Sequence, residues 1–265
     1  MPLITNDAPK RAATQTIGRA GLILACFTPA EPFLTLAELA GKVDLNPSTV
    51  YRYLTTLEAV GLLVKEPNSG RYGLGLKVIE LAGTALSQNE ACSQSLDTMD
   101  RLRDELGYPV SLRVLLEGDV LDLGHAVPKD APRIFPVIGR RWPAHLTAAG
   151  KALLADLPAE GARALIDRYG WRPTTPQSIQ DHTRLEAELA ETRERGYSTE
   201  MEEFRRGLGS LAAPIYGSGG AVVAALSLTA GADQLTPEYR RRLLPPLLAA
   251  TERISFRLGF RGACL

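Results

Sequence analysis

Two short stretches near the N-terminus carry apolar residues at helical spacing. The first begins with a capping box, in which Thr35 is followed three residues later by Glu38. The second begins with Asn46 as N-cap and Pro47 as first helical residue, and Gly61 ends it. The pattern therefore predicts two helices joined by a tight turn. Their apolar sides are Leu36, Leu39, Ala40 and Val43 in the first helix, and Val50, Leu54 and Leu57 in the second.

Two further apolar runs, at residues 62–65 and 71–74, flank a cluster of turn-forming residues at 67–70. They predict a short hairpin, so the order of elements is that of a winged helix-turn-helix. The polar side of its second helix carries hydroxyl groups and an arginine, which suit phosphates and base edges in a major groove. We therefore predict a unit that binds double-stranded operator DNA. Its candidate contacts are Ser48, Thr49, Tyr51, Arg52 and Thr55, with Arg71 near the tip of the wing.

An ordinary small helical domain with amphipathic helices and a hairpin is the alternative to a DNA-binding unit. Charge does not separate the two, because residues 1–80 hold eight lysines and arginines and seven acidic residues. Nucleic-acid domains are usually more basic than that. Arg52, Arg71, Lys65 and the arm at Lys10 and Arg11 would have to form a local positive patch, which a dimer would double.

Helical spacing continues on both sides of this unit. Residues 17–27 predict a first helix that completes the small core, and residues 76–106 predict two more helices with a polar break at 87–89. We read the first of those two as a linker helix. The predicted organisation is a DNA-binding domain at residues 1–75, a linker helix at 76–90 and a second domain at 91–265.

Beyond residue 107 the pattern changes to strands mixed with helices. The apolar runs at 211–216 and 222–229 are split by a glycine-rich turn, which predicts an antiparallel hairpin. The other predicted strands are 110–116, 120–127, 133–138 and 197–200. The predicted helices are 148–157, 160–169, 183–195 and 237–258, and Pro245 and Pro246 are candidate positions for a bend in the last one.

Composition restricts the function classes only broadly. At 265 residues and 45% hydrophobic content the chain can form two cores, and its zero net charge gives no general reason to bind membranes or polyanions. Three distant cysteines, Cys26, Cys92 and Cys264, indicate reduced thiols. The polar N-terminus does not resemble a signal peptide, and no run approaches transmembrane length. We expect a cytoplasmic protein without a membrane partner.

The motifs that enzyme chemistry needs are missing. No serine lies in a G-x-S-x-G frame, and Gly150-Lys151 lacks both the upstream glycine and the following hydroxyl of a phosphate-binding loop. The three histidines, His125, His145 and His182, are scattered, and no Cys/His cluster exists. We therefore expect no catalytic residue, no metal and no cofactor.

Seven motifs in order resemble the IclR family of bacterial transcriptional regulators, over essentially the whole chain. They are Thr35-Leu36-Ala37-Glu38-Leu39-Ala40, Pro47-Ser48-Thr49-Val50-Tyr51-Arg52-Tyr53-Leu54, Gly70-Arg71-Tyr72-Gly73-Leu74-Gly75, Pro143-Ala144-His145-Leu146-Thr147-Ala148-Ala149-Gly150-Lys151-Ala152-Leu153-Leu154-Ala155, Glu202-Glu203, Ala212-Ala213-Pro214 and Ala224-Ala225-Leu226-Ser227. The resemblance implies an α+β protein with a winged helix-turn-helix, a linker helix and a GAF-like α/β effector domain whose sheet is mostly antiparallel. It also implies homodimers or homotetramers.

The resemblance further implies an effector site between a helix N-terminus and the sheet. A helix N-terminus favours an anion, so a small organic acid, such as an aromatic or keto acid, is the expected effector. Three side chains depart from common family choices and leave the effector's identity open: Ser210 for Cys, Glu200 for Asp and Thr229 for Ser. The implied site consists of the amides of Ala148 and Ala149 with Glu200, Ser210, Ser227 and Thr229; the alternative for the last two is that they are ordinary strand residues. We expect apolar pocket walls, with Leu112, Val114 and Leu123 as candidates from strand alternation and Trp142 as a candidate lid.

Three function classes remain at this point. An effector-responsive transcriptional regulator of a catabolic or metabolic operon explains both predicted domains. An enzyme of another chemistry explains only the pocket. The third class is a purely structural or protein-interaction module. A gel shift with DNA from upstream of the protein's own gene separates the first class from the other two. Activation and repression are equally compatible with the sequence.

Overall fold

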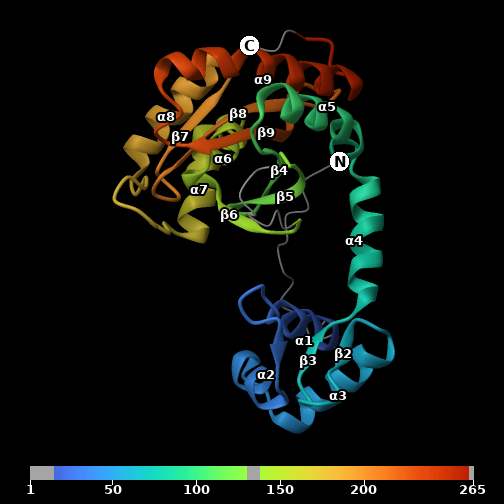
Figure 1. The fold of residues 1–265 in the computed structure, drawn as a ribbon. Coiled ribbons are helices and arrows are strands. Elements are labelled where there is room, and N and C mark those ends of the chain that lie inside the picture. Colours follow the sequence, from blue (N-terminus) through green and yellow to red (C-terminus); the bar gives the residue numbers. More distant parts are fainter. Residues whose placement is uncertain (1–14, 130–137, 263–265) are drawn as a thin grey trace. The chain divides into compact units, whose positions relative to one another are not determined.

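The computed structural model describes residues 15–129 and 138–262. The chain divides into two compact units between Gln88 and Asn89. Figure 1 shows the N-terminal unit with its helices and small sheet, and the larger C-terminal unit built on a second sheet. In the described ranges, no helix is long and apolar enough to cross a membrane.

The N-terminal unit is a winged helix-turn-helix. Its helices are α1 (Gln15–Ala25), α2 (Leu36–Val43) and α3 (Pro47–Ala59), and its strands are β1 (Phe33–Leu34), β2 (Leu63–Lys65) and β3 (Tyr72–Leu74). Both predicted helix starts are present: Thr35 and Glu38 form a capping box, and the Asn46 side chain accepts from the Ser48 amide. The core contains the predicted apolar side of α3 together with Ile23, Leu34, Leu39 and Leu63.

Strand β1 was not predicted. It has two residues and pairs antiparallel with β3, with Phe33 opposite Gly73. A two-residue strand is too short to give an alternating pattern, so its partner strand defines it. The wing is therefore a three-stranded sheet in the order β1-β3-β2.

Two helices follow the wing. Helix α4 (Leu76–Gln88) has no buried residue, and it ends at the predicted polar break. Asn89 caps the next helix, α5 (Glu90–Leu106), by accepting from the Cys92 amide. Gly107 ends α5 in the left-handed conformation, with φ 73°.

The C-terminal unit is built on a six-stranded sheet in which every neighbouring pair is antiparallel. The strand order is β6-β5-β4-β9-β8-β7. The central hairpin, β8 with β9, agrees with the predicted one. The strands are β4 (Val110–Leu116), β5 (Asp119–Ala126), β6 (Arg141–Pro143), β7 (Ser198–Met201), β8 (Leu208–Tyr216) and β9 (Val222–Gly231).

Helices cover both faces of this sheet (Figure 1). Helices α5 and α9 (Pro237–Arg257) pack against each other and on one face. On the other face lie the short turn η2 (Ala144–Leu146) and α6 (Ala148–Ala155), backed by α8 (His182–Arg195) and α7 (Ala159–Tyr169). Since both faces are covered, apolar and polar side chains occur on both, which matters for the cavity described below.

Most predicted elements of the C-terminal unit agree with the structure to within a few residues. The predicted strand at 133–138 lies outside the described residues except for Ile138, and β6 was not predicted. Helix α9 continues through Pro245 and Pro246. The fold is α+β, with an N-terminal winged helix-turn-helix and a C-terminal domain around an antiparallel sheet, as predicted.

Candidate functional site

The outer side of α3 is polar and exposed. Ser48, Arg52 and Thr55 are exposed, and Tyr51 exposes 52% of its surface. The Arg52 guanidinium has no hydrogen bond or ion pair with any residue in the described ranges. Thr49 is half-buried beside this surface. The helix therefore presents hydroxyl groups and one unengaged guanidinium on the side opposite its apolar core.

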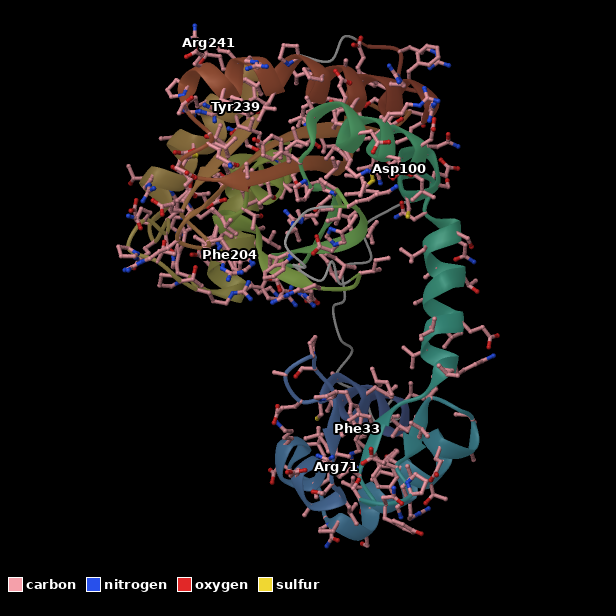
Figure 2. The ribbon with its side chains drawn as sticks, viewed as in Figure 1. Phe33, Arg71, Asp100, Phe204, Tyr239 and Arg241 are labelled. Carbon is pink, nitrogen blue, oxygen red and sulfur yellow. The ribbon has the colours of Figure 1, made fainter. Side chains whose placement is uncertain are left out.

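Arg71 at the wing is already engaged within the unit. Its guanidinium lies 3.6 Å from Glu66 Oε2, and Nε donates to Ser69 Oγ at 3.4 Å. The guanidinium carbon also lies 5.8 Å from the ring centroid of Phe33, and Figure 2 shows these two residues in the same unit. The predicted arm at Lys10 and Arg11 lies outside the described residues.

A cavity of about 1040 Å³ opens in the C-terminal unit, on the sheet face that carries α6. Three of the predicted effector residues line it: Glu200, Ser210 and Thr229. Thr147, the N-cap of α6, also lines it. The remaining walls include Tyr108, Ser111, Arg113, Asp122, His125, Arg140, Trp142, Phe204, Gln234 and Tyr239.

Strand register brings the polar side chains together. Glu200 on β7 pairs with Ser210 on β8, which pairs with Thr229 on β9. Two residues before Thr229 on β9, Ser227 pairs with Ser111 on β4. Because side chains directly opposite one another project from the same face, these residues form two polar rows across neighbouring strands.

The Glu200 carboxylate is buried and accepts hydrogen bonds through both oxygens. Its Oε1 accepts from the amides of Glu203 at 2.7 Å and Phe204 at 3.2 Å, and its Oε2 accepts from Ser210 Oγ at 3.0 Å. Burial raises the pKa of Glu200 to about 7, against the opposing effect of these hydrogen bonds. Near neutral pH this carboxyl group therefore exists in both protonation states.

A charged network at the other end of the cavity was not predicted. Arg113 Nε donates to Asp122 Oδ1 at 2.6 Å, and Trp142 Nε1 donates to Asp122 Oδ2 at 2.7 Å. His125 Nδ1 lies 2.9 Å from Ser111 Oγ, and its Nε2 lies 3.5 Å from Asp122 Oδ2. Burial raises the pKa of Asp122, but His125, the Arg113 guanidinium and the Trp142 hydrogen bond together hold it below its usual range. The signal in the sequence was an arginine and an aspartate inside two predicted strands.

Ser227, Ala148 and Ala149 are fully buried and do not line the cavity. Ser227 lies behind the wall, where its Oγ accepts from Arg113 Nη1 at 3.3 Å. Ala148 and Ala149 follow Thr147 directly, at the start of α6. The site residues predicted from the sequence thus lie in one region, but Ser227, Ala148 and Ala149 are not part of the cavity wall.

The expectation that Leu112, Val114 and Leu123 form apolar walls was wrong. On β4 the cavity residues are Ser111 and Arg113, so the leucine and valine alternate away from it. Both faces of the sheet are covered by helices, and the alternation alone could not tell which face holds the cavity. Trp142, also expected at the pocket, does line it.

Behind Glu200 lies a buried ion pair. Lys151 on α6 is fully buried, and its Nζ lies 2.7 Å from Glu203 Oε1 and 3.2 Å from Glu188 Oε2. Burial raises the pKa of Glu203, although Lys151 opposes that effect. Because the Glu203 amide bonds Glu200, the pair helps to fix the backbone at this end of the cavity.

His145 in η2 is a buried histidine without hydrogen bonds to any residue in the described ranges. Its ring packs edge-on against Trp171, with centroids 5.1 Å apart. Burial lowers the pKa of His145 to about 4, so the ring is neutral at pH 7. In residues 15–129 and 138–262, no group of three His, Cys, Asp or Glu side chains is placed to hold a metal ion.

Comparisons with known proteins give the family. A model described as "Bacterial transcriptional regulator IclR C-terminal" matches residues 83–256, and one described as "IclR helix-turn-helix domain" matches residues 16–67. The glycerol operon regulatory protein of Streptomyces coelicolor is 33% identical over 237 residues, which cover 89% of this chain and 91% of that protein.

Solved structures with the same fold include an IclR transcriptional regulator from Alicyclobacillus acidocaldarius, at 27% identity and a TM-score of 0.81, covering 92% of this chain and 98% of that one. An IclR homologue from Microbacterium hydrocarbonoxydans, complexed with 4-hydroxybenzoate, has 23% identity and a TM-score of 0.80, covering 92% and 99%. At that identity the second likeness shows the fold alone. The chain belongs to the IclR family of bacterial transcriptional regulators, with an N-terminal DNA-binding helix-turn-helix domain and a C-terminal effector domain.

Proposed function

We propose that the protein regulates a catabolic or metabolic operon and that a small organic acid in the C-terminal cavity changes its affinity for operator DNA. The observation that carries this proposal is the cavity itself, which combines a ligand-sized volume with buried charged and hydroxyl groups from several strands. The cavity is lined by three arginines, Arg113, Arg140 and Arg205, and by two carboxyl groups, those of Asp122 and Glu200. This excess of positive charge favours an anionic ligand. The N-terminus of α6 below Thr147 adds a positive helix end.

A hydroxylated acid fits the polar lining better than a simple one. Glu200 accepts hydrogen bonds when ionised, so it suits a hydroxyl group of the effector and repels a carboxylate. The 4-hydroxybenzoate bound by the Microbacterium homologue is a compound of this class and is a reasonable first probe. Ser210 and Thr229 offer further hydroxyl partners from the same row of the sheet.

A gel shift with DNA from upstream of the protein's own gene tests the proposal directly. The DNA is titrated with protein alone and with millimolar 4-hydroxybenzoate, 4-hydroxyphenylacetate or pyruvate. We expect specific retardation and a change in operator affinity with at least one acid. If the protein binds the DNA specifically but no organic acid changes its affinity, the proposed effector class is refuted. If the protein does not bind the DNA specifically, the proposal that this DNA contains its operator is refuted.

Arg52→Ala should weaken operator binding by about 1 to 3 kcal/mol, because Arg52 is the unengaged guanidinium on the polar side of α3 and an arginine reads guanine bidentately. Fluorescence anisotropy with labelled operator and with scrambled DNA measures the effect. If Arg52 instead contacts phosphate, the loss should be equal on both DNAs, and the salt dependence should become less steep.

Arg101→Ala is the matched control for this variant. It removes the same charge from an exposed site on α5, where Arg101 pairs with Asp97 at 3.0 Å. We expect it to bind operator like the wild type. Equal affinities of Arg52→Ala and wild type would remove Arg52 from the DNA contacts.

We also propose that the protein binds a pseudo-palindromic operator as a homodimer or homotetramer. A single recognition helix with one free arginine covers too few base pairs for specific binding, and two-fold symmetry doubles that footprint. Residues of α1 and α4 are candidates for the subunit contact, since Ile17, Leu76 and Ile79 are large apolar side chains that are more than two-thirds exposed, up to 81% for Leu76. Sedimentation of the protein with and without operator tests this, and a specific complex containing one chain would contradict it.

A further inference from the structure

The cavity has two chemically different ends. At one end, strands β7, β8 and β9 present Glu200, Ser210 and Thr229. At the other end, β4 and β5 present Arg113 and His125 around the Asp122 carboxylate. The first end offers a hydrogen-bond acceptor with hydroxyl neighbours, and the second offers a guanidinium held by its own carboxylate partner. An effector that fills the cavity meets both ends.

We propose that Arg113 binds the carboxylate of the effector, and that Glu200 accepts a hydrogen bond from a hydroxyl group at the effector's opposite end. The inference rests on the proposed function, since it requires an organic acid in this cavity. It names a residue outside the set implied by the family resemblance, and it restricts the effector class to ring-sized hydroxy acids.

Arg113 is held in place before any ligand binds. Its side chain is 12% exposed, with Nε bonded to Asp122 at 2.6 Å and Nη1 bonded to Ser227 at 3.3 Å. Asp122 is held in turn by Trp142. The Nη2 nitrogen of Arg113 has no partner in the part of the chain that the structure describes. A guanidinium fixed along one edge keeps N–H donors in the planar arrangement that suits a carboxylate.

Charge favours the same orientation of the ligand. Asp122 offsets the charge of Arg113, and the Arg140 guanidinium, which stacks 4.0 Å from the Trp142 ring centroid, adds a second positive charge at this end that its exposure to solvent weakens. At the other end the buried carboxyl group of Glu200 repels a carboxylate whenever it is ionised. Arg205 also lines the cavity but is exposed, so solvent screens its charge.

The strand register relates the two serines that hold Arg113 and Glu200. Arg113 bonds Ser227, and Glu200 bonds Ser210 on the neighbouring strand. Ser227 pairs with Ala212, two residues from Ser210, and such diagonal positions are about 7 to 8 Å apart. A hydroxy acid with its hydroxyl group across an aromatic ring from the carboxylate has a length comparable with this spacing, whereas acids of two or three carbons are shorter.

Calorimetric titration of the full-length protein tests the orientation with matched probes. The acids are 4-hydroxybenzoate, 4-hydroxyphenylacetate and 4-hydroxycinnamate, each with its deoxy acid and its neutral amide, and pyruvate is the short acid. We expect at least one hydroxy acid to bind, and its deoxy and amide partners to bind about tenfold more weakly or worse. Pyruvate should bind more weakly than that hydroxy acid.

Variants then locate the carboxylate. Arg113→Gln should weaken binding of the hydroxy acid by about tenfold or more and leave binding of its amide nearly unchanged. Arg113→Lys keeps the positive charge but loses the planar guanidinium, so it should give a smaller loss of affinity. It takes the place of Arg113→Gln if that variant does not fold. The control is Arg141→Gln on β6, because Arg141 pairs with Asp119 at 2.9 Å and Glu117 at 2.8 Å but does not line the cavity.

Glu200→Gln separates this model from docking on the α6 N-terminus. If the carboxylate lies at Arg113, the variant should leave the affinity for the deoxy acid unchanged. Tighter binding of every acid to Glu200→Gln, together with an unaffected Arg113→Gln, would overturn the inference in favour of α6. If pyruvate binds as tightly as the ring acids, the inferred orientation is overturned and the proposed function stands. If no organic acid binds, both the inferred orientation and the proposed effector class are overturned.

Discussion

Lys151→Met should destabilise the C-terminal unit by about 3 to 5 kcal/mol, the cost of leaving a buried charge without its partner. Lys151 is fully buried, and within the described ranges its ammonium group is the only side chain that hydrogen-bonds the Glu203 carboxylate. Urea unfolding followed by tryptophan fluorescence measures the effect. Both tryptophans, Trp142 and Trp171, lie in the C-terminal unit, so the signal reports that unit alone.

A double variant and an exposed ion pair serve as controls for this prediction. Replacing both partners, as Lys151→Met with Glu203→Leu, should recover much of the lost stability, because the only charge left without Lys151 is then that of Glu188, whose side chain is 27% exposed to solvent. Arg163→Met removes an exposed pair between α7 and α8, with side chains 51% and 42% exposed, and should change stability by less than about 1 kcal/mol. A single Lys151→Met variant as stable as Arg163→Met would show that the buried pair contributes little.

The C-terminal unit should lose about 3 kcal/mol of stability through His145 alone as the pH falls from 7 to 4. The folded-state pKa of about 4 lies below the ordinary value of 6.5. Between these values the unfolded chain binds a proton that the folded chain does not, so this contribution is complete above pH 6.5 and is lost as the pH falls toward 4. Burial is the main cause of the lowered pKa of His145. The nearby Arg172 lowers this pKa further, and Asp119 raises it.

His145→Phe isolates this contribution, because it keeps an aromatic ring against Trp171 and removes the titrating group. We expect its free energy of unfolding, measured by urea titration at pH 7, 6, 5 and 4, to fall less steeply than that of the wild type. The control is His182→Phe, since His182 also packs on Trp171 but pairs with Asp167 at 2.8 Å. That variant should not flatten the curve. Parallel curves for His145→Phe and wild type would disprove the assignment.

The sequence by itself determined the local structure and the order of the elements. Thr35 with Glu38, and Asn46 with Pro47, specify helix starts through hydrogen bonds within one turn, and the structure has both. The polar break before Asn89 likewise marks the start of α5. Such signals need no distant partner, so residue chemistry is enough to read them. The motif order was enough to indicate the family.

Only the tertiary structure decided which polar residues share the cavity. Ser111 and Arg113 line the cavity and Leu112 does not, but a strand covered by helices on both faces has no side that alternation can mark as the pocket. Antiparallel register then placed Glu200 beside Ser210 and brought Ser227 against Arg113. These neighbours are separated by ten or more positions in the chain. Long-range pairing sets such contacts, and no local pattern in one sequence encodes that pairing.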